Sequence, residues 1–144
     1  MPPSPSLRFW ACASLLLVAV AGCGSSEGAL EDDQPRITSE SAVVNLLTQR
    51  GYLVRQTGFG SERVEGVRSN DYEVERQRRE YLRMWTFGSE AQAERAAREV
   101  RSRGRSSGSA LRRGVYQSGR LVVEYVGSDP AIRSDFRAAL GRPS

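Results

Sequence analysis

The sequence lacks two side chains on which many enzymes depend, histidine and lysine. None of the 144 residues is histidine, and all 21 residues counted as lysine plus arginine are arginine. A histidine general base, a histidine-ligated metal site and a lysine Schiff base are therefore excluded. We accordingly expect no enzymatic activity, no cofactor, and no catalytic or metal-binding residues.

Cysteine is almost as scarce, because only Cys12 and Cys23 occur. Cys12 lies in an N-terminal segment that we expect to be removed, and Cys23 follows directly after that segment. The mature domain would then have no disulfide and no spare thiol nucleophile. A zinc site built from cysteine and histidine is excluded for the same reason.

The N-terminus has the plan of a signal peptide. Arg8 is the only charged residue before an apolar run at 9–21, and this run is shorter than the roughly 20 residues that span a bilayer. The sequence then reads Val20-Ala21-Gly22-Cys23, which resembles the lipobox of bacterial lipoproteins. This resemblance implies removal of residues 1–22 and attachment of lipid to Cys23. An ordinary signal peptide with an incidental cysteine is the alternative.

Residues 23–37 are expected to form a flexible acidic tether, because they are small, polar or acidic and offer little to bury. A folded domain would then occupy residues 38–144. Gly24, rather than the aspartate that resembles an inner-membrane retention signal, follows the cysteine. We therefore expect a lipid-anchored envelope protein, in the outer membrane if the host has two membranes and otherwise on the outer face of the cytoplasmic membrane.

The charge of the mature chain is mild. Removing residues 1–22 takes away only Arg8, which leaves 20 arginines against 17 acidic residues, a net charge of +3. Nucleic-acid binding is not expected from so small an excess, least of all in an exported protein.

Cap residues and the spacing of apolar side chains predict three helices. Thr38 or Ser39 can cap the first helix, and Ser89 with Gln92 three residues later is the capping-box pattern of the second. Asp129 can cap the third. The predicted helices cover residues 39–50, 89–103 and 129–140.

Alternating or β-branched runs predict five strands separated by turn residues. The first hairpin is expected to turn near Arg78-Arg79, the second at Ser118-Gly119, and residues 59–70 are expected to be a loop. The predicted strands cover residues 52–58, 72–76, 81–87, 115–117 and 120–126. The order α-β-β-β-α-β-β-α predicts an α+β domain, a single mostly antiparallel sheet of about five strands with three helices packed on one face.

Two segments, MWTFGSEAQA at 84–93 and VYQSGRLVVEYVGSDP at 115–130, carry a resemblance. In both, a strand leads into a helix through a glycine and a cap residue. Residues 40–141 resemble, loosely, small bacterial secreted lipoproteins of unknown function. The resemblance implies a similar domain and brings no activity, cofactor or catalytic residue with it.

Two groups of side chains form a candidate partner surface. Tyr81, Trp85 and Phe87 share one face of a predicted strand, and they would form a binding surface if nothing covers them. The alternative is that helices or the 59–70 loop cover both faces of the strand.

The second group is arginine-rich: seven arginines between Arg95 and Arg113 face only Glu99. They could contact an anionic envelope polymer, lipid headgroups or an acidic protein. Alternatively they form a solvated face, with Arg98 and Arg103 paired along the helix to Glu94 and Glu99. The arginines assigned to the candidate surface are Arg101, Arg103, Arg105, Arg112 and Arg113.

The leading hypothesis is a membrane-anchored, non-enzymatic module that binds an envelope protein or an anionic envelope polymer. A small-ligand carrier with an apolar pocket is one alternative. A hydrolase that uses carboxylates such as Glu73, Glu75 or Glu124 is another. Near the first hairpin, ion pairs across the strands are the simpler account of the alternating glutamates and arginines.

Overall fold

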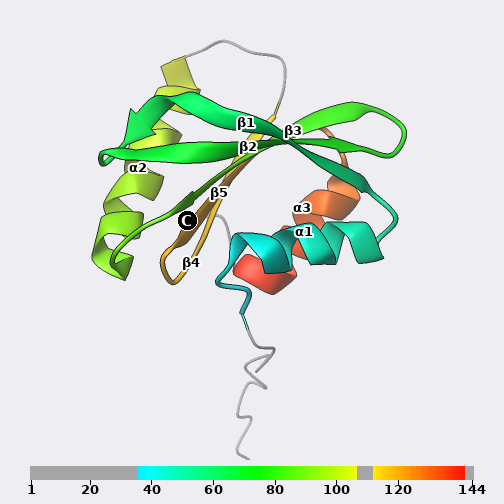
Figure 1. The fold of residues 1–144 in the computed structure, drawn as a ribbon, viewed down its shortest axis with the longest axis horizontal. Coiled ribbons are helices and arrows are strands. Elements are labelled where there is room, and N and C mark those ends of the chain that lie inside the picture. The colour runs from blue at the N-terminus through cyan, green and yellow to red at the C-terminus, as the bar shows by residue number, and fades with distance from the viewer. Residues whose placement is uncertain (1–35, 107–111, 142–144) are drawn as a thin grey trace, which may run out of the picture. The chain divides into compact units, whose positions relative to one another are not determined.

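Five strands pair in one antiparallel sheet on which three helices pack (Figure 1), so the predicted α+β class and element order are confirmed. The computed structural model describes residues 36–106 and 112–141. The strands lie in the order β1-β2-β3-β5-β4. The elements are α1 Glu40–Gln49, β1 Leu53–Val64, β2 Val67–Glu75, β3 Arg79–Thr86, α2 Glu90–Ser106, β4 Arg113–Ser118, β5 Leu121–Val126 and α3 Pro130–Leu140.

The predicted signal peptide, Cys23 and the tether up to residue 35 lie outside the described residues. Ile37, at the end of the predicted tether, is already part of the fold: its N–H donates to the carbonyl of Ala139 at 3.0 Å, and its side chain packs against the core. Within residues 36–106 and 112–141, no helix is both long enough and apolar enough to cross a membrane.

The ends of α1 are set by side-chain and backbone hydrogen bonds, as its sequence predicts. Ser39 is the cap, since its Oγ accepts a hydrogen bond from the N–H of Ala42 at 3.3 Å. At the other end, Gly51 adopts a φ of 84°. The N–H groups of Gly51 and Tyr52 then donate to the carbonyls of Thr48 and Leu47, both at 3.0 Å. This is a Schellman motif, and it directs the chain into β1.

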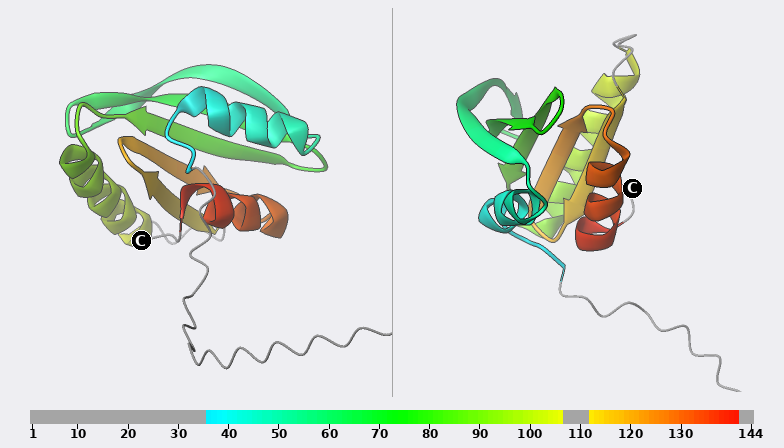
Figure 2. Two further views of the ribbon diagram at one scale, coloured as in Figure 1. Left: turned by 90° about the horizontal axis from the view of Figure 1, so that it is seen from below. Right: turned by 90° about the vertical axis from the view of Figure 1, so that its right-hand side faces the viewer.

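The helices do not share one face of the sheet, so that expectation was wrong. On β3, Met84 packs in a core formed with α1 and α3, whereas the next residue, Trp85, packs in a second core formed with α2. Neighbouring residues of a strand point to opposite faces, so α2 lies across the sheet from α1 and α3. Figures 1 and 2 show α2 at one end of the molecule and α1 beside α3 at the other.

The expected 59–70 loop is also wrong, because these residues belong to a β1–β2 hairpin. β1 continues to Val64 and β2 starts at Val67, with Glu65 and Gly66 between them. Both turn residues have positive φ, 47° and 80°, the conformation of a type I′ turn. The Glu-Gly pair gave only a weak turn signal, and the glycines and polar residues before it suggested a loop. In the hairpin, these glycines and polar residues are accommodated by register shifts between Gln56 and Gly58 and between Phe59 and Arg63.

Replacing Gly66 by alanine tests this hairpin. The φ of 80° is costly for any residue with a Cβ, although an added Cβ would meet no atom within 4 Å. We expect the free energy of unfolding to fall by about 1 kcal/mol, as measured by urea denaturation. In the control Gly88→Ala, the new Cβ makes only an ordinary contact, at 3.6 Å from Gln92 Oε1, so little change is expected. Equal effects of the two substitutions would contradict the assigned turn.

Candidate binding site

Helix α2 covers only part of its face of the sheet. Trp85 and Phe87 are 3% and 2% exposed and pack against α2 residues such as Ala93 and Ala97. Tyr81, four residues before Trp85 on the same face of β3, remains 46% exposed. The predicted aromatic surface is therefore not formed as a unit. The alternative, that a helix covers the face, holds for Trp85 and Phe87, and only Tyr81 is available to a partner.

The five predicted arginines do not form one group either. Arg103 on α2 and Arg113 at the start of β4 both reach the same hollow. Arg101 is half-buried on α2, and Arg112 is exposed, with its carbonyl accepting a hydrogen bond from Arg133. Arg105 lies in the last turn of α2, and its side chain is outside the described part of the structure.

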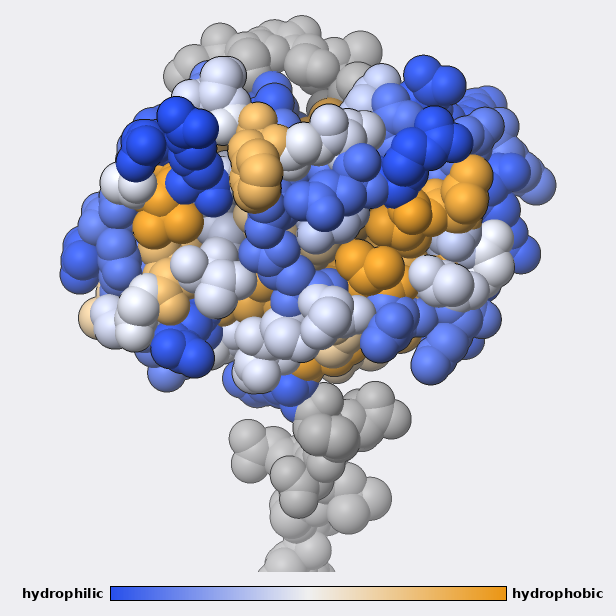
Figure 3. Space-filling model, in the orientation of Figure 1, coloured by the Kyte–Doolittle hydropathy of each residue, from blue (hydrophilic) through white to orange (hydrophobic). Residues whose placement is uncertain are grey.

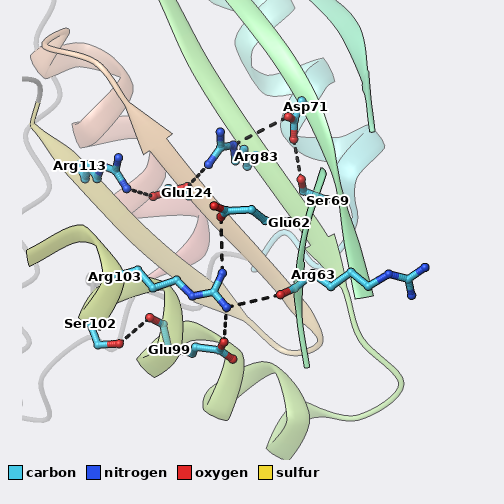
Figure 4. A network of polar contacts seen from close by, with 10 residues as sticks. All are labelled: Glu62, Arg63, Ser69, Asp71, Arg83, Glu99, Ser102, Arg103, Arg113 and Glu124. Atoms are coloured by element: carbon cyan, nitrogen blue, oxygen red, sulfur yellow. Dashed lines mark hydrogen bonds and ion pairs between the residues drawn. The ribbon is translucent and has the colours of Figure 1, made fainter. Parts of the chain in front are cut away.

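The hollow has a volume of about 600 Å³ and lies beside α2 on the α2 face of the sheet. In Figure 4 the guanidinium groups of Arg83, Arg103 and Arg113 enter it from β3, α2 and β4, whereas the side chain of Arg63 points away. Glu62 and Arg63 of β1 complete the lining. We call Arg83, Arg103 and Arg113 the arginine triad.

Arg83 is a site residue that the sequence analysis missed. It lies between Tyr81 and Trp85 at the same period-two positions of β3, so it shares their face of the sheet. That spacing was visible in the sequence. The sequence did not reveal that β3 pairs with β5. This pairing places Arg83 opposite Glu124 and makes it a site residue.

Glu124 of β5 lies between two members of the triad. It is only 2% exposed, and its Oε1 is 3.3 Å from Nη1 of Arg113 while its Oε2 is 3.7 Å from Nη1 of Arg83. Burial raises the pKa of the Glu124 carboxyl above its ordinary value, and the two arginines only partly oppose this. The carboxyl therefore keeps its proton to a higher pH than an exposed glutamate does.

The other charges of the network bear out part of the ion-pair alternative. Arg103 pairs with Glu99 one helical turn earlier, as expected, and with Glu62 at 3.5 Å. Arg83 also lies 3.8 Å from Asp71 of β2. Arg83, Arg103 and Arg113 nevertheless keep side-chain exposures of 43%, 41% and 31%, so each still presents surface to solvent.

The remaining carboxylates named as hydrolase candidates lie elsewhere on the sheet. Glu73 contacts Arg55 at 3.9 Å and Arg79 at 3.7 Å, which confirms the expected ion pairs across the strands. Glu75 is exposed at the end of β2. Neither residue lines the hollow that the triad forms.

A second polar cluster surrounds Glu80, a carboxylate that is 6% exposed at the start of β3. Its Oε1 accepts hydrogen bonds from the N–H groups of Ser128 and Asp129, at 2.8 and 3.1 Å, and its Oε2 accepts one from the hydroxyl of Tyr125. A Cβ on Gly127 would meet this carboxylate at 2.6 Å. Because the protein's own donors hold both oxygens of Glu80, the cluster secures the entry to α3.

A hollow of about 430 Å³ lies next to this cluster. Arg76 and Arg78 of the β2–β3 turn form part of its lining together with Tyr52, whose ring lies 5.4 Å from the Arg76 guanidinium. The Tyr52 hydroxyl donates to Asp129 Oδ2 at 2.8 Å, and burial is the main cause of its raised pKa. Two arginines line this hollow and four line the hollow of the triad, so the triad hollow is the stronger candidate site for an anion.

Comparisons with known proteins found no matching family model, no matching curated protein and no matching solved structure. The resemblance to small secreted lipoproteins therefore stays a prediction, and the case for a function depends on the chain's own geometry.

The role assigned to Glu80 predicts a loss of stability in Glu80→Gln. The amide oxygen can still accept from Ser128 and Asp129, but these bonds lose their charge assistance, and the amide nitrogen cannot accept from the Tyr125 hydroxyl as Oε2 does. We expect the free energy of unfolding to fall by about 2 kcal/mol, measured by urea denaturation. In the control Glu75→Gln, on the neighbouring strand and exposed, the change should stay within about 0.5 kcal/mol. A Glu80 variant as stable as the control would show that the cluster does not hold α3.

Proposed function

We propose that this protein is a non-enzymatic binding module of the bacterial cell envelope, anchored by lipid on Cys23, and that its partner is an anionic envelope component. The observation that carries the proposal is that Arg83, Arg103 and Arg113 converge on one hollow. This hollow lies on the α2 face of the sheet, in the part that α2 does not cover. The anchor is supported by the lipobox sequence.

Physical reasons favour binding of an anion at this place. Arginine retains its charge at any physiological pH and presents several N–H donors in a fixed plane, which suits carboxylate and phosphate groups. Tyr81 adds an exposed ring on the same face of β3. On the face that Figure 3 draws, hydrophobic residues form patches bordered by hydrophilic ones. The charged lining of the hollow favours an anionic, hydrated partner there.

One observation keeps the hydrolase alternative as a second candidate. Glu124 has a raised pKa, as a general acid requires, and Glu62 is a second carboxylate near the same hollow. However, Glu62 is paired with Arg103, and its side chain is 67% exposed, which does not favour a carboxylate poised to activate water. Robust turnover of an envelope polymer by the purified protein would favour this candidate and overturn the proposed function.

The anchor predicts a specific mass and location. In the native host, the mature chain should lack residues 1–22, carry acyl groups on Cys23 and sediment with membranes. Cys23→Ala should abolish both the acyl mass and the membrane residence, since no other cysteine follows residue 23. Intact mass spectrometry and membrane fractionation of both proteins provide the measurement. A wild-type protein without acyl groups in the soluble fraction would contradict the anchor.

The arginine hollow predicts charge-dependent binding to isolated envelopes of the host. In Arg83→Gln/Arg113→Gln, the fraction of protein that sediments with envelopes should fall about 10-fold, because two charge-assisted contacts are lost. Added salt should weaken wild-type binding in the same direction.

The matched control is Arg55→Gln/Arg79→Gln. It removes two arginines that flank Glu73 but do not line the hollow, and it causes the same change in net charge. Binding should remain near the wild-type value. If both double variants lose binding equally, then net charge alone is responsible and the hollow is not the site.

A further inference from the structure

We propose that the arginine triad binds a phosphate group of the partner and that this binding is coupled to the uptake of a proton by Glu124. The inference rests on the proposed function and deepens it, because it names the chemical group that is bound and the residue that regulates the affinity.

The arrangement of the triad favours phosphate over carboxylate. Arg83, Arg103 and Arg113 come from β3, α2 and β4, and in Figure 4 their guanidinium groups approach the hollow from different sides. A tetrahedral phosphate has oxygens that point in several directions and can accept from donors on all these sides. A planar carboxylate accepts best from donors in its own plane, and one arginine already supplies these.

Glu124 competes with such a ligand for the same arginines. Its carboxylate lies between Arg83 and Arg113, at 3.7 and 3.3 Å. While it is ionised, it attracts both guanidinium groups and repels an anion in the hollow above it. Once Glu124 is protonated, it has no charge, so it no longer attracts the two guanidinium groups and no longer repels the phosphate.

The charges around Glu124 come from every neighbouring element of this face. Those that act on Glu124 directly are Arg83 on β3, Arg113 on β4, Asp71 on β2 and Glu62 on β1. Helix α2 contributes Arg103 and Glu99, which join the network through the Arg103–Glu62 pair. With Glu124 ionised, four carboxylates contact the triad: Glu124 and Asp71 at Arg83, Glu124 at Arg113, and Glu62 and Glu99 at Arg103. With Glu124 neutral, the charge that contacts both Arg83 and Arg113 is gone, while Glu62, which extends into solvent, and Glu99 still contact Arg103. Asp71 contacts Arg83 in either state.

The sign of the pH dependence follows from linkage. A phosphate binds better to the protein with neutral Glu124, so its binding must raise the affinity of Glu124 for a proton. Burial already raises the pKa of Glu124. Affinity for phosphate should therefore be highest at low pH and decrease as the pH rises through the pKa that Glu124 has in the folded protein.

The test is a calorimetric titration of the full chain, purified from host membranes in nonionic detergent, with poly(glycerol phosphate). Each phosphodiester of this polymer is a strong acid and keeps a single charge throughout the titrated range, so any pH dependence belongs to the protein. We expect wild-type affinity to fall as the pH rises through the pKa that Glu124 has in the folded protein. We also expect tighter binding than to polygalacturonate, a carboxylate polymer, at equal charge concentration.

The decisive variant is Glu124→Gln, which keeps the shape of the side chain and permanently removes its charge. Its affinity should be nearly independent of pH and about 10-fold above that of the wild type at pH 8, the effect of one like charge removed from a partly buried site. The matched control is Glu73→Gln, since Glu73 also lies between two arginines, Arg55 and Arg79, but away from the hollow. It should behave like the wild type.

The outcomes separate this inference from the proposed function. Equal binding of both polymers with dependence on the triad would overturn the phosphate assignment and leave the proposed function standing. A wild-type affinity that does not change with pH, or a Glu124→Gln variant that binds no more tightly, would overturn the coupling to Glu124. Failure to bind either polymer or host envelopes would overturn both proposals.

A second arm identifies the source of the phosphate. If a lipid headgroup is the natural ligand, phosphatidylglycerol added to the detergent micelles should compete with poly(glycerol phosphate), and the competition should disappear in Arg83→Gln/Arg113→Gln. If micelles with and without this lipid give the same polymer affinity, the phosphate belongs to a polymer.

Discussion

Strands β3 and β5 bury hydrophobic side chains on both of their faces, and the rest of the structure depends on this constraint. Met84 and Val123 face α1 and α3, whereas Trp85 and Val122 face α2. A sheet that is apolar on both sides needs a helix on each side to keep these groups from water. The small residues Ala93, Ala96 and Ala97 let α2 pack closely enough to cover Trp85.

The candidate site exists because this second cover is incomplete. Along β3, the α2 face changes from hydrophobic at Trp85 to charged at Arg83 and then to the half-exposed Tyr81. Where α2 no longer covers the sheet, Arg83 and Arg113 can approach Glu124 from the two neighbouring strands. Strands β3 and β4 thus contribute both to the core and to the lining of the hollow.

Local signals predicted most of the fold, since a cap such as Ser39 or Asp129 acts within a few residues. The β1–β2 hairpin was missed because its turn, Glu65-Gly66, follows a polar and glycine-containing stretch that suggests a loop. For the site, Arg103 and Arg113 were named from charge density alone, but Arg83 and the position of Glu124 depend on strand pairing over about 40 residues of sequence. Burial of Trp85 and Phe87 likewise required knowledge of where α2 packs.

The burial of Glu124 is itself an argument for function. A carboxylate that is removed from water loses its hydration. The attraction of two neighbouring arginines compensates for this loss only in part, which is why the pKa of Glu124 is raised. A hydrophobic residue in the same position would extend the α2 core formed by Val115 and Val122 and would avoid that cost. Stability alone therefore does not favour glutamate here. A residue whose charge can be removed by a proton, held against two arginines that line a solvent-accessible hollow, is better explained by regulation of what the arginines bind.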